Sequence, residues 1–216
     1  GGALRLTELS TGVEIIGDNQ RFFANPLPVV SHIIAAILYS VLGAFQFLGG
    51  FRRRFPKWHR RAGRLLILAS LIVALSGLWM SHFYPWPELD GELLYAMRLF
   101  FGTAMLLAIF ASINAIRKRK FMQHGAWMMR AYAIGVAAGT QVFTHLPLII
   151  FPDLLNESTR ALCMGAGWVI NLCVAEWVIR RRMSQRKQSR RRPYLSFLQR
   201  PDTKNPTNLN YETATK

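Results

Sequence analysis

The feature that most constrains the fold of this chain is a basic segment between two long apolar runs. Residues 51–64, FRRRFPKWHRRAGR, contain seven Lys or Arg, whereas residues 29–50 and 65–83 are predominantly apolar. Runs of this length can cross the hydrocarbon core of a bilayer as helices, and Lys and Arg are enriched in the cytoplasmic loops that join such helices. The segment therefore predicts a cytoplasmic turn between two transmembrane helices.

The rest of the chain repeats this alternation. Three more apolar runs follow, at residues 93–116, 124–150 and 161–179. Of the 27 Lys and Arg, 19 fall in three clusters, at residues 52–64, 117–120 and 180–192, whereas the connections at 84–92 and 151–158 have none. This sorting predicts an all-α, polytopic transmembrane helical bundle of five spans, with the N-terminal segment outside and the C-terminus cytoplasmic.

The same pattern divides the chain into three parts. We expect an extracytoplasmic segment at residues 1–26, the bundle at 27–182, and a basic and then polar cytoplasmic tail at 183–216. From Pro193 the tail is rich in Pro, Asn and Thr, so we expect it to be disordered unless a membrane-protein partner holds it.

The net charge of +16 would suit a nucleic acid, but the position of the charge does not. Each basic cluster adjoins an apolar run at the predicted cytoplasmic end, and no known nucleic-acid reader motif accompanies it. The expected counter-surface is the anionic inner leaflet of the lipid bilayer. We therefore expect no nucleic-acid partner.

Several motifs of the chain are similar to those of a known family. They are RFFANPLPVVSHI, GAFQFL followed by RRRFPKWHRRAGR, HGAWMMRAYA and GWVINLCVAEWVIRR, in this order between Arg21 and Arg181. On these motifs the chain resembles the bacterial multi-pass membrane proteins of domain-of-unknown-function family 2306. The resemblance implies a bacterial cytoplasmic (inner) membrane protein, with one more span before Gly1 and six in the full-length protein. It implies no activity.

All five histidines lie near a predicted membrane boundary. His32, His82 and His145 fall at the outer ends of their runs, and a heme iron can take two axial imidazoles from facing helices. We expect these three to hold heme b, with His32 and one of the other two as ligands, or a mononuclear metal. The alternative is that they are interfacial histidines bonded to carbonyls or headgroups.

His59 and His124 form a second, inner group, on motifs of the family. His124 and His145 are 21 residues apart on one predicted helix, about 31 Å, which argues against two hemes inside one bundle. The arginines near the inner group would also repel a metal cation. We therefore favour the outer group as the cofactor site.

Three charged side chains fall inside the predicted spans. Arg130 and Glu176 lie at matching depths in their runs, which predicts a structural ion pair. Arg98 has no acidic partner at its depth in the sequence pattern. We expect it to bind an anionic group near the outer histidines: a heme propionate, a quinone oxygen or a lipid headgroup.

Two functions are compatible with this sequence. One is an electron-transfer protein that uses heme or a metal and exchanges electrons with a quinone or a protein. The other is a non-catalytic accessory or scaffold subunit of a larger membrane assembly. The sequence shows no nucleophile–base pair, P-loop, dinucleotide fingerprint or CxxC, so enzyme activity is left open. A transporter is disfavoured because the pattern shows no broken helix.

Overall fold

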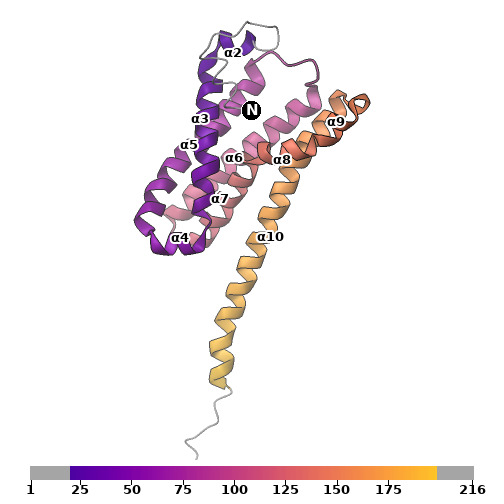
Figure 1. Cartoon of the computed structure of the whole chain (residues 1–216). Helices are drawn as coiled ribbons and strands as arrows, with labels where there is room; N and C mark the ends of the chain where they lie inside the picture. Colours follow the sequence, from indigo (N-terminus) through magenta and orange to yellow (C-terminus); the bar gives the residue numbers. More distant parts are fainter. Residues whose placement is uncertain (1–19, 199–216) are drawn as a thin grey trace, which may run out of the picture. The chain divides into compact units, whose positions relative to one another are not determined.

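The computed structural model describes residues 20–198, and it is helical throughout its regular elements (Figure 1). The helices are α2 (Gln20–Ala24), α3 (Pro26–Gln46), α4 (Gly49–Arg54), α5 (Pro56–Phe83), α6 (Glu92–Arg117), α7 (Phe121–Gly135), α8 (Ala137–Thr144), α9 (Leu146–Ile150) and α10 (Glu157–Leu198), with a 3-10 turn at Pro152–Leu154. Four of these helices, α3, α5, α6 and α10, are long and apolar enough to cross a membrane. A fifth span is formed if α7 and the segment 137–150 count as one bent helix. The predicted all-α transmembrane bundle is confirmed.

The chain divides into two compact units, residues up to Glu176 and residues from Trp177 onward. The first contains α2 to α9 and the N-terminal part of α10. In it we call the end that carries residues 52–64 and 117–120 the basic end, and the end that carries residues 84–91 the opposite end. The predicted segment 1–26 lies mostly outside the described residues, which begin with α2 and then Pro26 of α3.

The basic segment is helical, which corrects the prediction of a turn over residues 51–64. It consists of α4 and the first turns of α5, which meet at Phe55. Pro56 occupies the first turn of α5, where its missing N–H is tolerated, and a residue before proline is driven out of helical conformation. Phe55 accordingly has φ −126° and ψ 64°. The chain therefore changes direction at Phe55 between α4 and α5, and most of the basic charge lies on helix surfaces.

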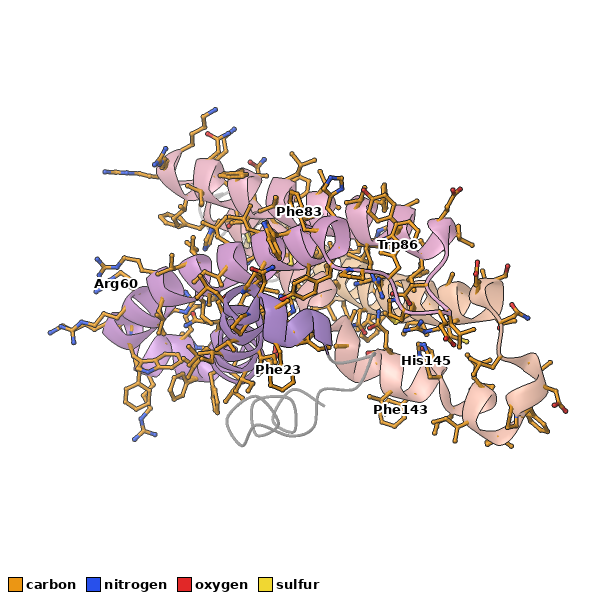
Figure 2. The ribbon with its side chains drawn as sticks, turned by 90° about the horizontal axis from the view of Figure 1, so that it is seen from above. Phe23, Arg60, Phe83, Trp86, Phe143 and His145 are labelled. Atoms are coloured by element: carbon orange, nitrogen blue, oxygen red, sulfur yellow. The ribbon has the colours of Figure 1, made fainter. Side chains whose placement is uncertain are left out.

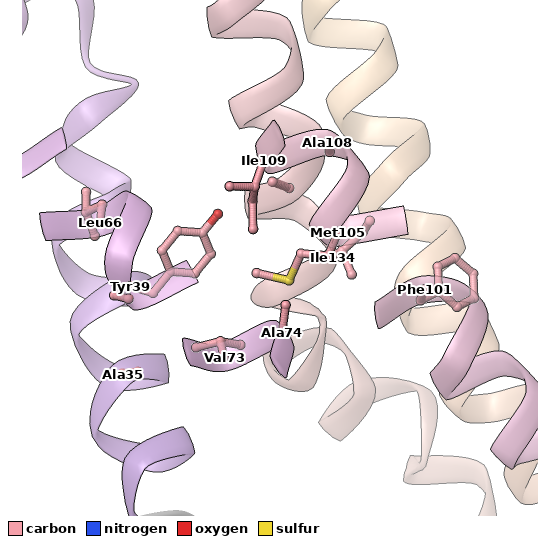
Figure 3. Close-up of a cluster of buried hydrophobic side chains, with 12 residues drawn as sticks. Ala35, Tyr39, Leu66, Val73, Ala74, Phe101, Met105, Ala108, Ile109 and Ile134 are labelled. Carbon is pink, nitrogen blue, oxygen red and sulfur yellow. The ribbon is translucent and has the colours of Figure 1, made fainter. Parts of the chain in front are cut away.

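Helices α3, α5, α6 and α7 surround one core, which Figure 3 shows in close-up. Tyr39 is 1% exposed at its centre, and its ring lies edge-on to Tyr132 with 5.5 Å between centroids. A Cβ at Gly135 would come within 2.7 Å of the Tyr39 ring, and one at Gly43 would clash with the Tyr132 ring. A side chain at either position would therefore clash with a tyrosine ring, so both positions require glycine. Small residues of this kind let apolar helices pack closely in a bilayer, where burial from water does not drive their association.

The fourth apolar run is bent, whereas the sequence predicts one straight helix over 124–150. The helix breaks at Val136 with an angle of 44° between the two parts. Next to the break, the Asn171 side chain donates to the Ala133 carbonyl at 3.0 Å and accepts from Thr140 Oγ1 at 2.7 Å. A side chain inserted into a helix ladder is an established cause of a kink, and in a bilayer a freed carbonyl needs such a partner. The expectation of no broken helix is therefore wrong.

Helix α10 begins at Glu157 and ends at Leu198, well past the predicted end of the last run at residue 179. The helix thus includes the basic cluster at 180–192, which is rich in arginine, a good helix former. Residues 193–198, predicted to be disordered, are helical as well. The rest of the polar tail lies outside the described residues.

Candidate functional site

His32 is held between α3 and α5. Its Nδ1 lies 2.9 Å from Ser76 Oγ, and its Cε1 is 3.4 Å from where a Gly77 Cβ would be. Ser76 Oγ donates its one hydrogen to the Ile72 carbonyl at 2.5 Å, so it accepts from His32 and Nδ1 carries the proton. His32 therefore faces the bundle, as the sequence predicts, and it packs against α5.

The other two outer histidines have separate partners. His82 Nδ1 pairs with Tyr95 Oη at 2.8 Å, and His145 Nδ1 donates to the Gln141 carbonyl at 2.7 Å. Within residues 20–198, no group of three or more His, Cys, Asp or Glu side chains could hold a metal ion. The structure therefore does not gather His32, His82 and His145 into the predicted metal site, since each Nδ1 bonds to a different partner.

At the basic end, His124 on α7 is held in one tautomer by α6. Its Nδ1 lies 2.7 Å from Ser112 Oγ and 3.2 Å from the Ser112 carbonyl. Since a carbonyl can only accept, His124 Nδ1 carries the proton and its Nε2 keeps a free lone pair. Ser112 itself is fully buried. This is the arrangement that orients a metal-binding imidazole through its second nitrogen.

His59 on α5 lies near enough to His124 for the charges of the two rings to interact. Its Nδ1 is buried, and it has no hydrogen-bond partner among the described residues. A buried polar atom without a partner is rare and points to a missing ligand or water. Arg52 and Arg60 also interact electrostatically with His59. Figure 2 shows Arg60 at this end of the bundle, with Trp86 and His145 at the other.

Arg98 has an acidic partner, contrary to the sequence prediction. Asp90, whose side chain is 3% exposed, accepts from Arg98 Nη1 at 2.6 Å and pairs through its other oxygen with Arg160 of α10. Asp90 lies two residues before the start of α6, and the long side chain of Arg98 extends from within α6 to reach it. One buried carboxylate therefore joins three segments at the opposite end.

The ion pair predicted between Arg130 and Glu176 is present in the structure. Arg130 Nη2 donates to Glu176 Oε2 at 3.1 Å, and its Nε bonds the other oxygen of the same carboxylate. The guanidinium also lies over the Trp127 ring, 4.5 Å from its centroid. A two-pronged pair of this kind fixes α7 against α10.

A comparison with protein families matches residues 29–179 to the model described as "Predicted membrane protein (DUF2306)". The chain belongs to the DUF2306 family. The match includes all five apolar runs and all five histidines, which confirms the resemblance drawn from the motifs. Together with the apolar helices, it makes this DUF2306 protein an integral membrane protein. No curated protein and no solved structure matches the chain.

Sequence reasoning missed the residues that organise these sites in the DUF2306 protein. Ser112 and His124 lie at similar distances from the tight turn at Lys118–Lys120, so an antiparallel pairing of the flanking helices would have placed them together. Asp90 offered a weaker signal, since Glu88 and Glu92 stand beside it. Its burial depends on the path of the connection, which no pattern in the residues shows.

Proposed function

We propose that this protein is a membrane electron carrier that holds heme b between His59 and His124. The proposal rests mainly on the buried Nδ1 of His59, which has no hydrogen-bond partner within residues 20–198, beside an imidazole that Ser112 orients. Two imidazoles from facing helices are a donor set that suits a b-type heme. A bound heme would supply reversible one-electron oxidation and reduction, and its potential depends on its burial and hydrogen bonds.

The charge around the inner histidines suits heme better than a bare metal ion. Arg52 and Arg60 would repel a free cation. A heme carries two propionates, which arginines pair with well. An added Cβ at Gly63, one turn after His59, would meet no atom within 4 Å, so no neighbour packs against α5 at that point. The residues present therefore fit this group.

The opposite end supports a heme less well than the sequence predicts. Arg98, the residue expected to bind a propionate, is already paired with Asp90. His32 bonds to Ser76 of α5, whereas His82 and His145 bond to Tyr95 and to the Gln141 carbonyl, so the three outer rings share no common partner. We therefore move the proposed heme to the basic end, and we keep a quinone in the bilayer as the proposed electron partner.

An absorption spectrum of the protein, purified after expression with added heme precursor, tests the proposal. We expect a Soret band and an α band that sharpens on reduction. His59→Ala and His124→Ala should each abolish both bands. Ser112→Ala should weaken heme binding about tenfold, since a lost partner of a ligating histidine typically costs ten- to a hundredfold. Ser81→Ala, which removes a hydroxyl that donates to the Gly77 carbonyl of the same helix, serves as the matched control.

Other results would point elsewhere. Loss of the bands in His32→Ala or His145→Ala, with His59→Ala unaffected, would return the heme to the opposite end. A colourless protein that folds normally would contradict the electron-carrier proposal. It would favour the accessory or scaffold function, in which the basic tail at 183–216 docks onto a membrane-protein partner.

We further propose that the basic end faces the cytoplasm of a bacterial inner membrane, with the C-terminus on that side. The clustering of Lys and Arg at 52–64, 117–120 and 180–192 supports this orientation. Reporter fusions after Lys120 and after Arg192 should report the cytoplasm, and fusions within 84–92 should report the outside. An external signal at Lys120 would contradict both the orientation and the number of spans.

A further inference from the structure

A groove between α3 and α5 lies on the lipid-facing side of the bundle. It has a volume of about 210 Å³ and is lined by eight residues: Ser31, Ile34, Ala35, Leu38, Leu65, Leu68, Ala69 and Ile72. Ala35 and Ala69 are buried at its floor, whereas Ile34 and Leu68 are 49% and 56% exposed at its rim. A dry apolar cavity of about 150 Å³ already holds a benzene molecule, so this groove has room for a segment of hydrocarbon chain.

The basic end of the groove is marked by positive charge. Arg61 precedes Leu65 by four residues and Leu68 by seven, so it lies on the groove-lining face of α5, one turn closer to the basic end. Arg64 precedes Leu68 by four residues. Both side chains are exposed, and neither has a carboxylate partner among the described residues. Long arginine side chains of this kind extend toward the headgroup layer.

An aromatic cluster adjoins the same end of the two helices. Phe45 of α3 packs against Phe51 of α4 and Trp58 of α5, with centroid distances of 5.9 and 6.5 Å. Aromatic rings are enriched where acyl chains meet headgroups. Along α5, Trp58 is followed by Arg61 and Arg64 and then by the groove residues Leu65 and Leu68, so the positive charge directly adjoins the apolar groove. A phospholipid likewise carries its phosphate next to its acyl chains.

We propose that this face is a binding site for an anionic phospholipid, with one acyl chain in the α3–α5 groove and the phosphate on Arg61 and Arg64. A second copy of the chain is a poorer occupant. Two-fold dimers in a membrane place like surfaces together, so α3–α5 contact would set the basic segments of both copies against each other. A zwitterionic lipid would leave the positive charge uncompensated.

Thermal unfolding of the full chain in detergent tests the site, with dioleoylphosphatidylglycerol and dioleoylphosphatidylcholine as probes that share their acyl chains. We expect phosphatidylglycerol to raise the Tm by at least about 5 °C more than phosphatidylcholine does. Arg61→Gln with Arg64→Gln should remove this difference, and Leu68→Trp should do so by filling the groove. The double variant Arg117→Gln with Lys118→Gln removes the same amount of charge from the basic end of α6. It should retain the difference in Tm shift between the two lipids.

Native mass spectrometry of the unmodified protein adds a test that needs no variant, and it should show retained phosphatidylglycerol. Equal Tm shifts with the two lipids would overturn the proposal. The proposal would also be overturned if the Arg117 and Lys118 variant lost the Tm difference to the same extent. The lipid would then be attracted by the positive charge of the whole basic end rather than by Arg61 and Arg64. A dimer that Leu68→Trp dissociates would assign the groove to a second copy instead.

Discussion

Replacing Asp90 by asparagine should destabilise this protein more than any other single change of charge at the opposite end. The substitution keeps the size of the side chain but leaves Arg98 and Arg160 without their shared carboxylate. Removing one member of a buried ion pair typically costs about 3–5 kcal/mol, because the remaining charge stays desolvated. We expect a fall in Tm of about 10 °C in detergent, measured by circular dichroism.

Two further variants separate this network from general effects of charge. Glu88→Gln removes an exposed carboxylate from the same connection and should change the Tm little. Adding Arg160→Gln to Asp90→Asn should restore part of the stability, since one fewer guanidinium is then unpaired. If Asp90→Asn unfolds at the wild-type temperature, the three-residue network has no structural role.

Glu176→Gln should destabilise the bundle by about 2 kcal/mol, because Arg130 would lose its carboxylate inside a membrane span. Arg130→Gln should cost more, since it also removes the cation–π contact with Trp127. The double variant should recover at least about 1 kcal/mol relative to the sum of the two single losses. A double-mutant cycle of unfolding free energies measures this coupling.

The outcome of that cycle decides between two roles for Arg130. Strictly additive losses would mean that the pair contributes no energy of its own. Arg130 would then be better explained by a ligand or a lipid phosphate. Trp127→Phe provides a control that keeps an aromatic ring beneath the guanidinium.

The apolar runs predicted the helices well because each is long enough to cross a bilayer and is bounded by charge. The run at 93–116 corresponds closely to α6, which begins at Glu92 and ends at Arg117. The start of α5 was missed by nine residues, since hydropathy cannot distinguish a basic helix from a basic loop. Pro56 was the usable signal there, because proline is favoured in the first turn of a helix.

The site was harder to predict than the fold. The ion pair of Arg130 and Glu176 followed from matching depths, since a charge inside a bilayer seldom lacks a partner. For the histidines, depth alone grouped His32 with His82 and His145. The structure gives each of them a partner on its own or an adjoining helix, because helix rotation decides which rings face one another. Rotation depends on small contacts such as those at Gly77 and Ser112.

The break at Val136 also determines how this span can match its membrane. As one straight helix, the stretch from Phe121 to Ile150 would measure about 45 Å, which exceeds a hydrocarbon core of about 30 Å. The 44° bend tilts the segment after the break and shortens its reach across the bilayer. The bend therefore lessens the hydrophobic mismatch of this span without a tilt of the part before the break.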